Sequence, residues 1–110
     1  MTNTELKKGS AELLILSLLD AEPRHGYQLG KLIESRSRGA LRFNAASLYP
    51  LLYRLEKKGW VQGRWVEAPR ERRRRLYRLT RTGRTVLASH RQSWARFVKA
   101  VARIVGPQYA

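Results

Sequence analysis

The sequence predicts a mainly α-helical fold with one small two-stranded β-hairpin, and three patterns of apolar residues support this prediction. Up to Gly59, leucines and isoleucines recur three and four positions apart, as along the buried face of a helix. From Val61 to Leu79 the spacing alternates, as in strands. From Leu87 apolar residues recur seven apart, which is typical of helices that pack against another helix. The expected order is helix, helix, helix, hairpin, helix.

The first helix should begin at Ser10, because a serine hydroxyl can cap a helix and Glu12 then lies in the first turn. Almost every residue from Leu13 to Leu19 is apolar. A helix that is apolar on nearly all sides is buried on more than one side. We therefore expect it to contact its own domain and a further surface, before Pro23 and Gly26 end it.

A second helix should span about Gly26 to Ser37, followed by a polar loop around Gly39. The third helix has two candidate caps, Asn44 and Ser47, and ends naturally at Gly59. It also contains a proline, and a proline in the interior of a helix costs about 3 kcal/mol.

The position of Pro50 therefore constrains the start of the third helix. A proline lacks the backbone N–H, which is harmless only in the first turn. We expect the helix to start at Ala46 or Ser47, or to bend slightly near residues 44–46.

The two faces of the third helix differ in chemistry. One face carries Leu48, Leu51, Leu52 and Leu55, and the other carries Ala46, Pro50, Tyr53, Arg54 and Lys57, with Ser47 and Tyr49 on its flanks. A helix that meets only water has little use for Pro50 or Tyr53, whereas a helix in a DNA groove can use hydroxyl and basic side chains for base and phosphate contacts. The alternative for Tyr49 and Tyr53 is packing against a neighbouring element.

Two strands are expected at residues 61–66 and 74–79, with a polar connection at 67–73. Nine arginines and two glutamates lie between Trp60 and Thr85, a net charge of +7. The run "RERRRR" (70–75) falls at the tip of the hairpin. Arginine suits bidentate contact with phosphate, although a solvated loop is the alternative for such a run.

The last helix should start after Thr80 or Thr82 and end at Gly106, which precedes a proline. Leu87, Trp94 and Val101 are seven residues apart, and Phe97 and Ile104 form a second row, with Val98 and Val105 alongside. Such a stripe needs more partner surface than one small domain supplies, so we expect a homodimer.

Charge and composition limit the classes of function. The chain has 110 residues, 23 lysines and arginines against 8 acidic residues, a net charge of +15 and no cysteine. Such a charge favours an anionic partner, with nucleic acid first, an acidic membrane surface second and a merely solubilising charge as the alternative. No apolar run is long enough to span a membrane and no secretion signal is evident, so we expect a cytoplasmic protein. No catalytic constellation, cofactor motif or metal-binding cluster is present, so we expect no enzyme, no cofactor and no metal.

Three helices followed by a two-stranded ribbon are the arrangement of a winged helix-turn-helix, in which the third helix enters the major groove of DNA and the ribbon, or wing, flanks it. Three segments carry a more specific resemblance: "HGYQL" (25–29), "SLYPLLYRLEKKGW" (47–60) and "RRLYRLTRTGR" (74–84). They resemble the PadR family of transcriptional regulators, from about residue 13 to residue 87. The resemblance implies a winged-helix dimer, usually a repressor, whose C-terminal helix packs against the partner's N-terminal helix.

Pattern and resemblance together assign the regions and residues. Residues 1–9 are an N-terminal extension, 10–80 the winged-helix DNA-binding domain, 81–106 the dimerisation helix and 107–110 a tail. The expected DNA-binding residues are Tyr27, Asn44, Ser47, Tyr49, Pro50, Tyr53, Arg54, Lys57, Arg70, Arg72, Arg73 and Arg74. The expected dimer interface contains Leu14, Leu18, Leu87, Trp94, Phe97, Val98, Val101 and Ile104.

Two hypotheses go further. Trp94 and Phe97 from the two subunits could flank a slot for a flat apolar effector, although plain interface packing is the alternative. The protein as a whole is expected to be a sequence-specific repressor of a palindromic operator. The alternative is a nucleoid-associated or RNA-binding protein that tolerates any sequence and binds mainly by charge.

Overall fold

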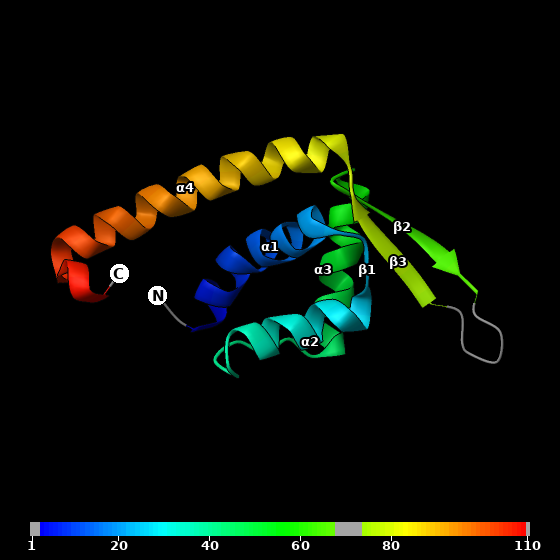
Figure 1. The fold of residues 1–110 in the computed structure, drawn as a ribbon, viewed down its shortest axis with the longest axis horizontal. Coiled ribbons are helices and arrows are strands. Elements are labelled where there is room, and N and C mark those ends of the chain that lie inside the picture. The colour runs from blue at the N-terminus through cyan, green and yellow to red at the C-terminus, as the bar shows by residue number, and fades with distance from the viewer. Residues whose placement is uncertain (1–2, 68–73, 110) are drawn as a thin grey trace.

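The computed structural model describes residues 3–67 and 74–109. Along the chain, the helices and strands are α1 (Asn3–Ala21), β1 (Arg24–His25), α2 (Gly26–Arg36), α3 (Ala45–Lys57), β2 (Val61–Val66), β3 (Arg74–Leu79) and α4 (Arg81–Val105), followed by a short 3₁₀ turn at Pro107–Tyr109 (Figure 1). The expected order of helices and hairpin is therefore confirmed, and the fold is a winged helix with a long C-terminal helix.

The sheet has three strands, where the sequence predicted two. β2 and β3 pair antiparallel from Val61 opposite Leu79 to Val66 opposite Arg74. β1 pairs antiparallel with the other edge of β3, with Arg24 opposite Tyr77, so the strand order is β1-β3-β2. A strand of two residues is too short to produce an alternating pattern, so β1 could not be predicted from the sequence.

Two helices begin earlier than the sequence predicted. α1 starts at Asn3, so Ser10 lies inside the helix and does not cap it. α3 starts at Ala45, after Asn44 caps it by accepting a hydrogen bond from the Ser47 backbone N–H (3.0 Å). Pro50 is therefore the sixth residue of α3 and not part of its first turn, so the expected late start was wrong.

The core lies beside the sheet, where α1, α2, α3 and the start of α4 meet (Figure 1). Its fully buried large side chains are Ile15, Leu16, Leu29, Leu52, Leu55, Leu79 and Leu87. All four leucines that the sequence placed on the inner face of α3 are buried. α1 also packs against α4, so the apolar N-terminal helix has neighbours on several sides, as expected.

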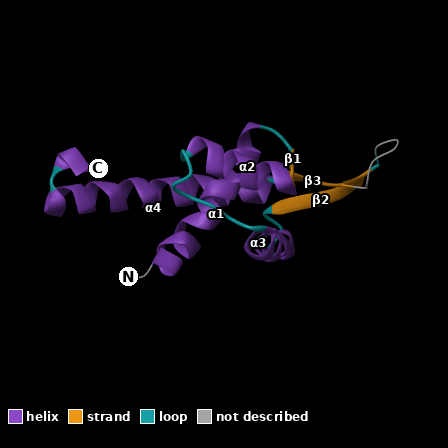
Figure 2. Cartoon of the chain, turned by 90° about the horizontal axis from the view of Figure 1, so that it is seen from below, coloured by secondary structure: helices purple, strands orange, loops and turns teal. Residues whose placement is uncertain are grey.

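The C-terminal half of α4 extends away from this core. Figure 2 shows its last turns at one end of the molecule and the sheet at the other, in a chain that measures 54 × 29 × 22 Å. Apolar side chains along this half are exposed: Trp94, Phe97, Val101, Ile104 and Val105. Among the residues described, no helix is both long and apolar enough to cross a membrane.

Candidate nucleic-acid interface

The outer face of α3 presents the polar and aromatic side chains that the sequence placed there. Tyr49 is 44% exposed and Tyr53 is 60% exposed, and Ser47, Arg54 and Lys57 are exposed as well. The four buried leucines on the inner face fix the rotation of the helix about its own axis. The exposed side chains therefore lie on the side of α3 that faces away from the core.

One side of α3 borders an open groove of about 810 Å³ between α1 and α3. Asn44, Ser47, Pro50 and Arg54 all line it, together with Arg42 from the loop before α3. The structure thus brings four of the expected DNA-binding residues together along this side of the helix, from its cap to its last turn. Farther along α3, the Lys57 ammonium lies 5.5 Å from the centre of the Tyr53 ring, so these two expected residues form a separate pair.

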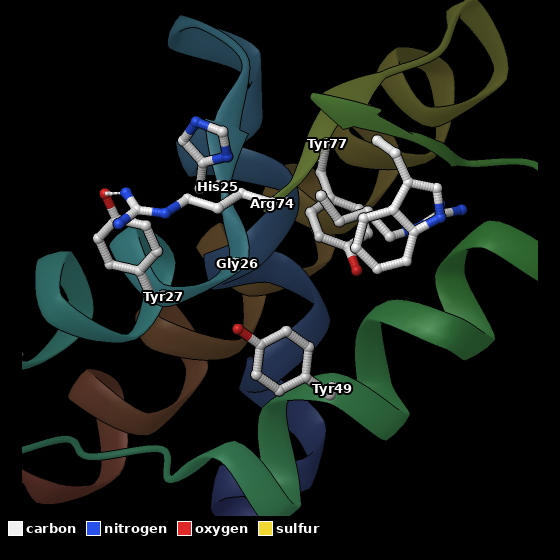
Figure 3. Close-up of a pocket in the computed structure, with 8 residues that line it drawn as sticks. His25, Gly26, Tyr27, Tyr49, Arg74 and Tyr77 are labelled. Carbon is white, nitrogen blue, oxygen red and sulfur yellow. Dashed lines mark hydrogen bonds between the residues drawn. The ribbon is translucent and has the colours of Figure 1, made fainter. Parts of the chain in front are cut away.

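A second cavity, of about 260 Å³, lies between α2, α3 and the wing. Figure 3 shows Tyr27, Tyr49 and Tyr77 around it, contributed by α2, α3 and β3. The Arg74 guanidinium donates a hydrogen bond to the Tyr27 hydroxyl (2.8 Å) and lies 4.9 Å from the centre of the same ring. Two expected DNA-binding residues that are 47 positions apart in sequence are therefore in direct contact.

The glycine that opens α2 explains how Tyr49 reaches this cavity. A Cβ atom at Gly26 would lie 2.8 Å from Cε1 of Tyr49. The Tyr49 ring of α3 therefore occupies the space that a side chain on α2 would otherwise fill. Beside it, the His25 and Tyr27 rings stack with centres 5.9 Å apart, and His25 Nδ1 has no hydrogen-bond partner within the described residues.

An ion pair that was not predicted from the sequence joins α3 to the wing. Oε1 of Glu56 accepts hydrogen bonds from Nε (3.1 Å) and Nη2 (2.9 Å) of Arg75, and Oε2 accepts one from Nη2 (3.0 Å). The guanidinium also lies 5.3 Å from the Trp65 ring centre and 5.9 Å from that of Tyr77. The sequence placed Arg75 in a run of phosphate-binding arginines, whereas the structure shows it already bound to a carboxylate.

The contacts around this ion pair change the pKa values of the Arg75 guanidinium and the Tyr77 hydroxyl. The hydrogen bonds from Arg75 to Glu56 raise the pKa of the Arg75 guanidinium above its usual value. Burial raises the pKa of the Tyr77 hydroxyl, and the negative charge of Glu56 adds to that shift. Both groups are therefore held more firmly in their protonated forms than they would be in water.

The remaining expected DNA-binding residues cannot be placed in this arrangement. Arg70, Arg72 and Arg73 lie outside the described residues. Next to them in the sequence, Arg74 is half-buried against Tyr27. On β2 and β3, Arg64 and Arg78 are exposed, and Arg78 donates a hydrogen bond to the side chain of Gln62.

The expected interface residues divide into two groups. Leu18 and Leu87 are 7% and 2% exposed in the single chain, so their side chains belong to its core and offer little area to a partner. Leu14 and Val98 are half-buried, while Trp94, Phe97, Val101 and Ile104 are exposed. The Trp94 and Phe97 rings touch, with centres 5.8 Å apart.

The described part of the chain holds no group of three or more side chains arranged to bind a metal ion.

Solved structures with the same fold come from several bacteria. The chain is similar to a transcriptional regulator from Clostridium thermocellum, with 27% identity over 92% of this chain and 98% of the other, and a TM-score of 0.84. It is similar to a PadR family transcriptional regulator from Eggerthella lenta (31% identity over 93% and 87%, TM-score 0.81). It is also similar to a PadR-like transcription factor from Bacteroides fragilis (32% identity over 93% and 96%, TM-score 0.76).

The sequence itself matches a family description over most of its length. The pattern of the PadR-like family of transcriptional regulators matches residues 15–89, which run from the middle of α1 into the first third of α4. This range contains the whole helix-turn-helix and the wing. The chain therefore belongs to the PadR-like family of transcriptional regulators, whose members are not enzymes.

Proposed function

We propose that the protein is a homodimeric, cytoplasmic repressor that binds a palindromic operator, with α3 in the major groove and the wing beside it. The observation that carries this proposal is the division of α3 into two faces. Its four leucines are buried, while Ser47, Tyr49 and Arg54 are exposed on the outer side. The fold provides the same placement of elements as other winged-helix DNA-binding proteins.

The exposed side chains of α3 have complementary tasks in this proposal. Ser47 and Tyr49 offer hydroxyl groups for bases or phosphates near the start of the helix, and Arg54 offers a fork that fits a phosphate or a guanine edge. Tyr27 and Arg74 form a joined pair at the side of α3, where the backbone of the duplex would pass. The arginines of the wing add affinity that does not depend on sequence.

The exposed apolar residues of α4 support the proposal of a dimer. Trp94, Phe97 and Ile104 are 48%, 46% and 86% exposed, which is unusual for large apolar side chains on one helix. A two-fold dimer through this surface would present two α3 helices to half-sites about one helical turn, or about 34–36 Å, apart.

We further propose that a small molecule regulates the repressor. Trp94 and Phe97 are in contact within one chain, and a two-fold axis nearby would bring a second pair opposite them. Such a slot between four aromatic rings would accept a flat apolar effector. Binding there would alter the angle between the α4 helices and so release the operator.

The experiment that tests the proposal measures binding of the purified protein to DNA from upstream of its own gene. A scrambled duplex of the same length is the control, and both are titrated across salt concentration. A repressor should prefer the operator by roughly a thousandfold or more, with one dimer per palindrome. If no genomic fragment is preferred and affinity depends only on salt, the charge of +15 supports the alternative of a sequence-tolerant nucleic-acid-binding protein.

A further inference from the structure

We infer that the Glu56–Arg75 ion pair is a clamp that fixes the angle between the recognition helix α3 and the wing, which makes Glu56 a positioning residue for operator recognition. This inference rests on the proposed function, since it concerns how two DNA-contacting elements are held together. Glu56 itself need not touch the DNA.

The geometry of the pair fixes orientation as well as distance. Both carboxylate oxygens of Glu56 accept from the Arg75 guanidinium, through three hydrogen bonds of 2.9–3.1 Å. A two-point contact of this kind resists rotation, whereas a single hydrogen bond would allow it. Glu56 lies in the last turn of α3 and Arg75 is the second residue of β3, so the contact spans the two elements directly.

The neighbouring strand β2 also packs against this ion pair. Gly63 of β2 lies so close that an added Cβ atom would stand 2.0 Å from Oε1 of Glu56 and 2.7 Å from Nε of Arg75. On the other sides the guanidinium faces the rings of Trp65 and Tyr77. The two charged side chains are only 28% and 21% exposed, so salt screens this pair less than an ordinary surface pair.

Charge alone does not account for a carboxylate at this place. The protein carries only eight acidic residues, and an acid between two DNA-contacting elements repels phosphate. Arg75 gains nothing as a phosphate ligand from being bound to Glu56. A contact that weakens attraction to DNA yet joins α3 to the wing is explained by the geometry that it imposes.

The substitution Glu56→Gln separates the two explanations because they predict opposite changes. If Glu56 affects DNA binding only through its negative charge, removing that charge and freeing Arg75 tightens binding to every duplex. If Glu56 acts by holding α3 and the wing at a fixed angle, operator affinity falls by about tenfold, comparable to the loss from one mismatched base pair. Affinity for the scrambled duplex then stays the same or rises, so the ratio of the two affinities drops.

Gly63→Ala is a second variant that keeps every charge. Its methyl group must displace the Glu56 carboxylate or the Arg75 guanidinium, so it should lower the same affinity ratio. The matched control is Asp20→Asn, which breaks another ion pair between two elements, Asp20 with Arg91 of α4 (3.4 Å), away from the wing. This control should leave the affinity ratio unchanged.

Amide hydrogen exchange provides a readout that needs no DNA. In Glu56→Gln, the β2 and β3 amides should exchange faster while those of α4 remain as in the wild type. Folded Glu56→Gln protein that keeps the wild-type affinity ratio, or binds the operator more tightly, would overturn the inference, and so would unchanged exchange in β2 and β3. If the wild-type protein prefers no duplex, the proposed function fails, and hydrogen exchange alone then decides whether the clamp exists.

Discussion

Gly83 lies in the first turn of α4 against the backbone of Trp60, where an added Cβ atom would come within 2.0 Å of the Trp60 carbonyl oxygen. Backbone cannot move aside as easily as the end of a side chain can. By contrast, an added Cβ atom at Gly30 in α2 would meet its nearest neighbours at 3.5 Å, an ordinary contact distance. The surroundings, not the residue type, decide what a methyl group does at each glycine.

Alanine at these two glycines should therefore have opposite effects. Gly83→Ala should lower the free energy of unfolding by about 1–3 kcal/mol, because α4 must shift away from Trp60. Gly30→Ala should raise it by about 0.5–1 kcal/mol, because alanine favours a helix over glycine. Urea unfolding followed by circular dichroism measures both. Equal effects of the same sign would contradict the packing described around Gly83.

The buried hydroxyl of Tyr77 makes stability sensitive to alkaline pH. Its raised pKa means that the folded chain holds this proton more tightly than the unfolded chain does. Stability from this source is complete below pH 10 and is lost as the pH rises from about 10 toward the folded-state pKa. Tyr77→Phe should therefore flatten the decline in unfolding free energy between pH 9 and 11. A decline in Tyr77→Phe as steep as in the wild type would contradict this account.

Among the elements, long periodic ones could be predicted from sequence and short or mixed ones could not. The leucine face of α3 and the strands at 61–66 and 74–79 follow from local spacing, and the structure confirms them. The start of α1 was missed because residues 3–9 carry no apolar stripe, and β1 was missed because two residues form no pattern. The Glu56–Arg75 pair depends on elements brought together by folding, which no local pattern reveals.

The junction between the wing and α4 depends on one hydroxyl group. Thr80 Oγ1 accepts from the Gly83 N–H (3.0 Å) and lies within donating distance of the carbonyl oxygens of Gly59 (2.7 Å) and Trp60 (3.0 Å). Thr80→Val keeps the shape and removes these hydrogen bonds, so it should cost about 1 kcal/mol of unfolding free energy. Thr82→Val, at an exposed position two residues on, is the control. A loss no larger than that of the control in thermal melts would show that the cap contributes nothing.

On the scale of the whole molecule, the sheet and the far half of α4 lie at different ends (Figures 1 and 2). Tyr27, Tyr49 and Arg74 gather beside the sheet, while Trp94, Phe97 and Ile104 are exposed on the far half of α4. In the proposed dimer, one end would therefore meet DNA while the other meets the second subunit. The burial of Leu87 within the single chain could not be judged from the heptad spacing, because the same spacing serves packing within one chain and packing between two.

The proposed dimer can be tested by charge on this stripe. Val101→Asp places a carboxylate among apolar side chains and should weaken self-association by at least about tenfold, since a buried unpaired charge is costly. Operator affinity should fall with it. Gln92→Asp, on the opposite side of α4, adds the same charge without entering the stripe and is the control. Sedimentation equilibrium measures both, and a dimer equally stable in both variants would rule out this surface as the interface.

The length of α4 also turns small rotations into large displacements. A helix of 25 residues is about 37 Å long at 1.5 Å per residue. If its far half is held by a partner, tilting it by about 5° moves its near end by roughly 3 Å, close to the rise of one base pair. In the proposed dimer, a ligand or a substitution at Trp94 would therefore change the spacing of the half-sites that the two α3 helices can reach.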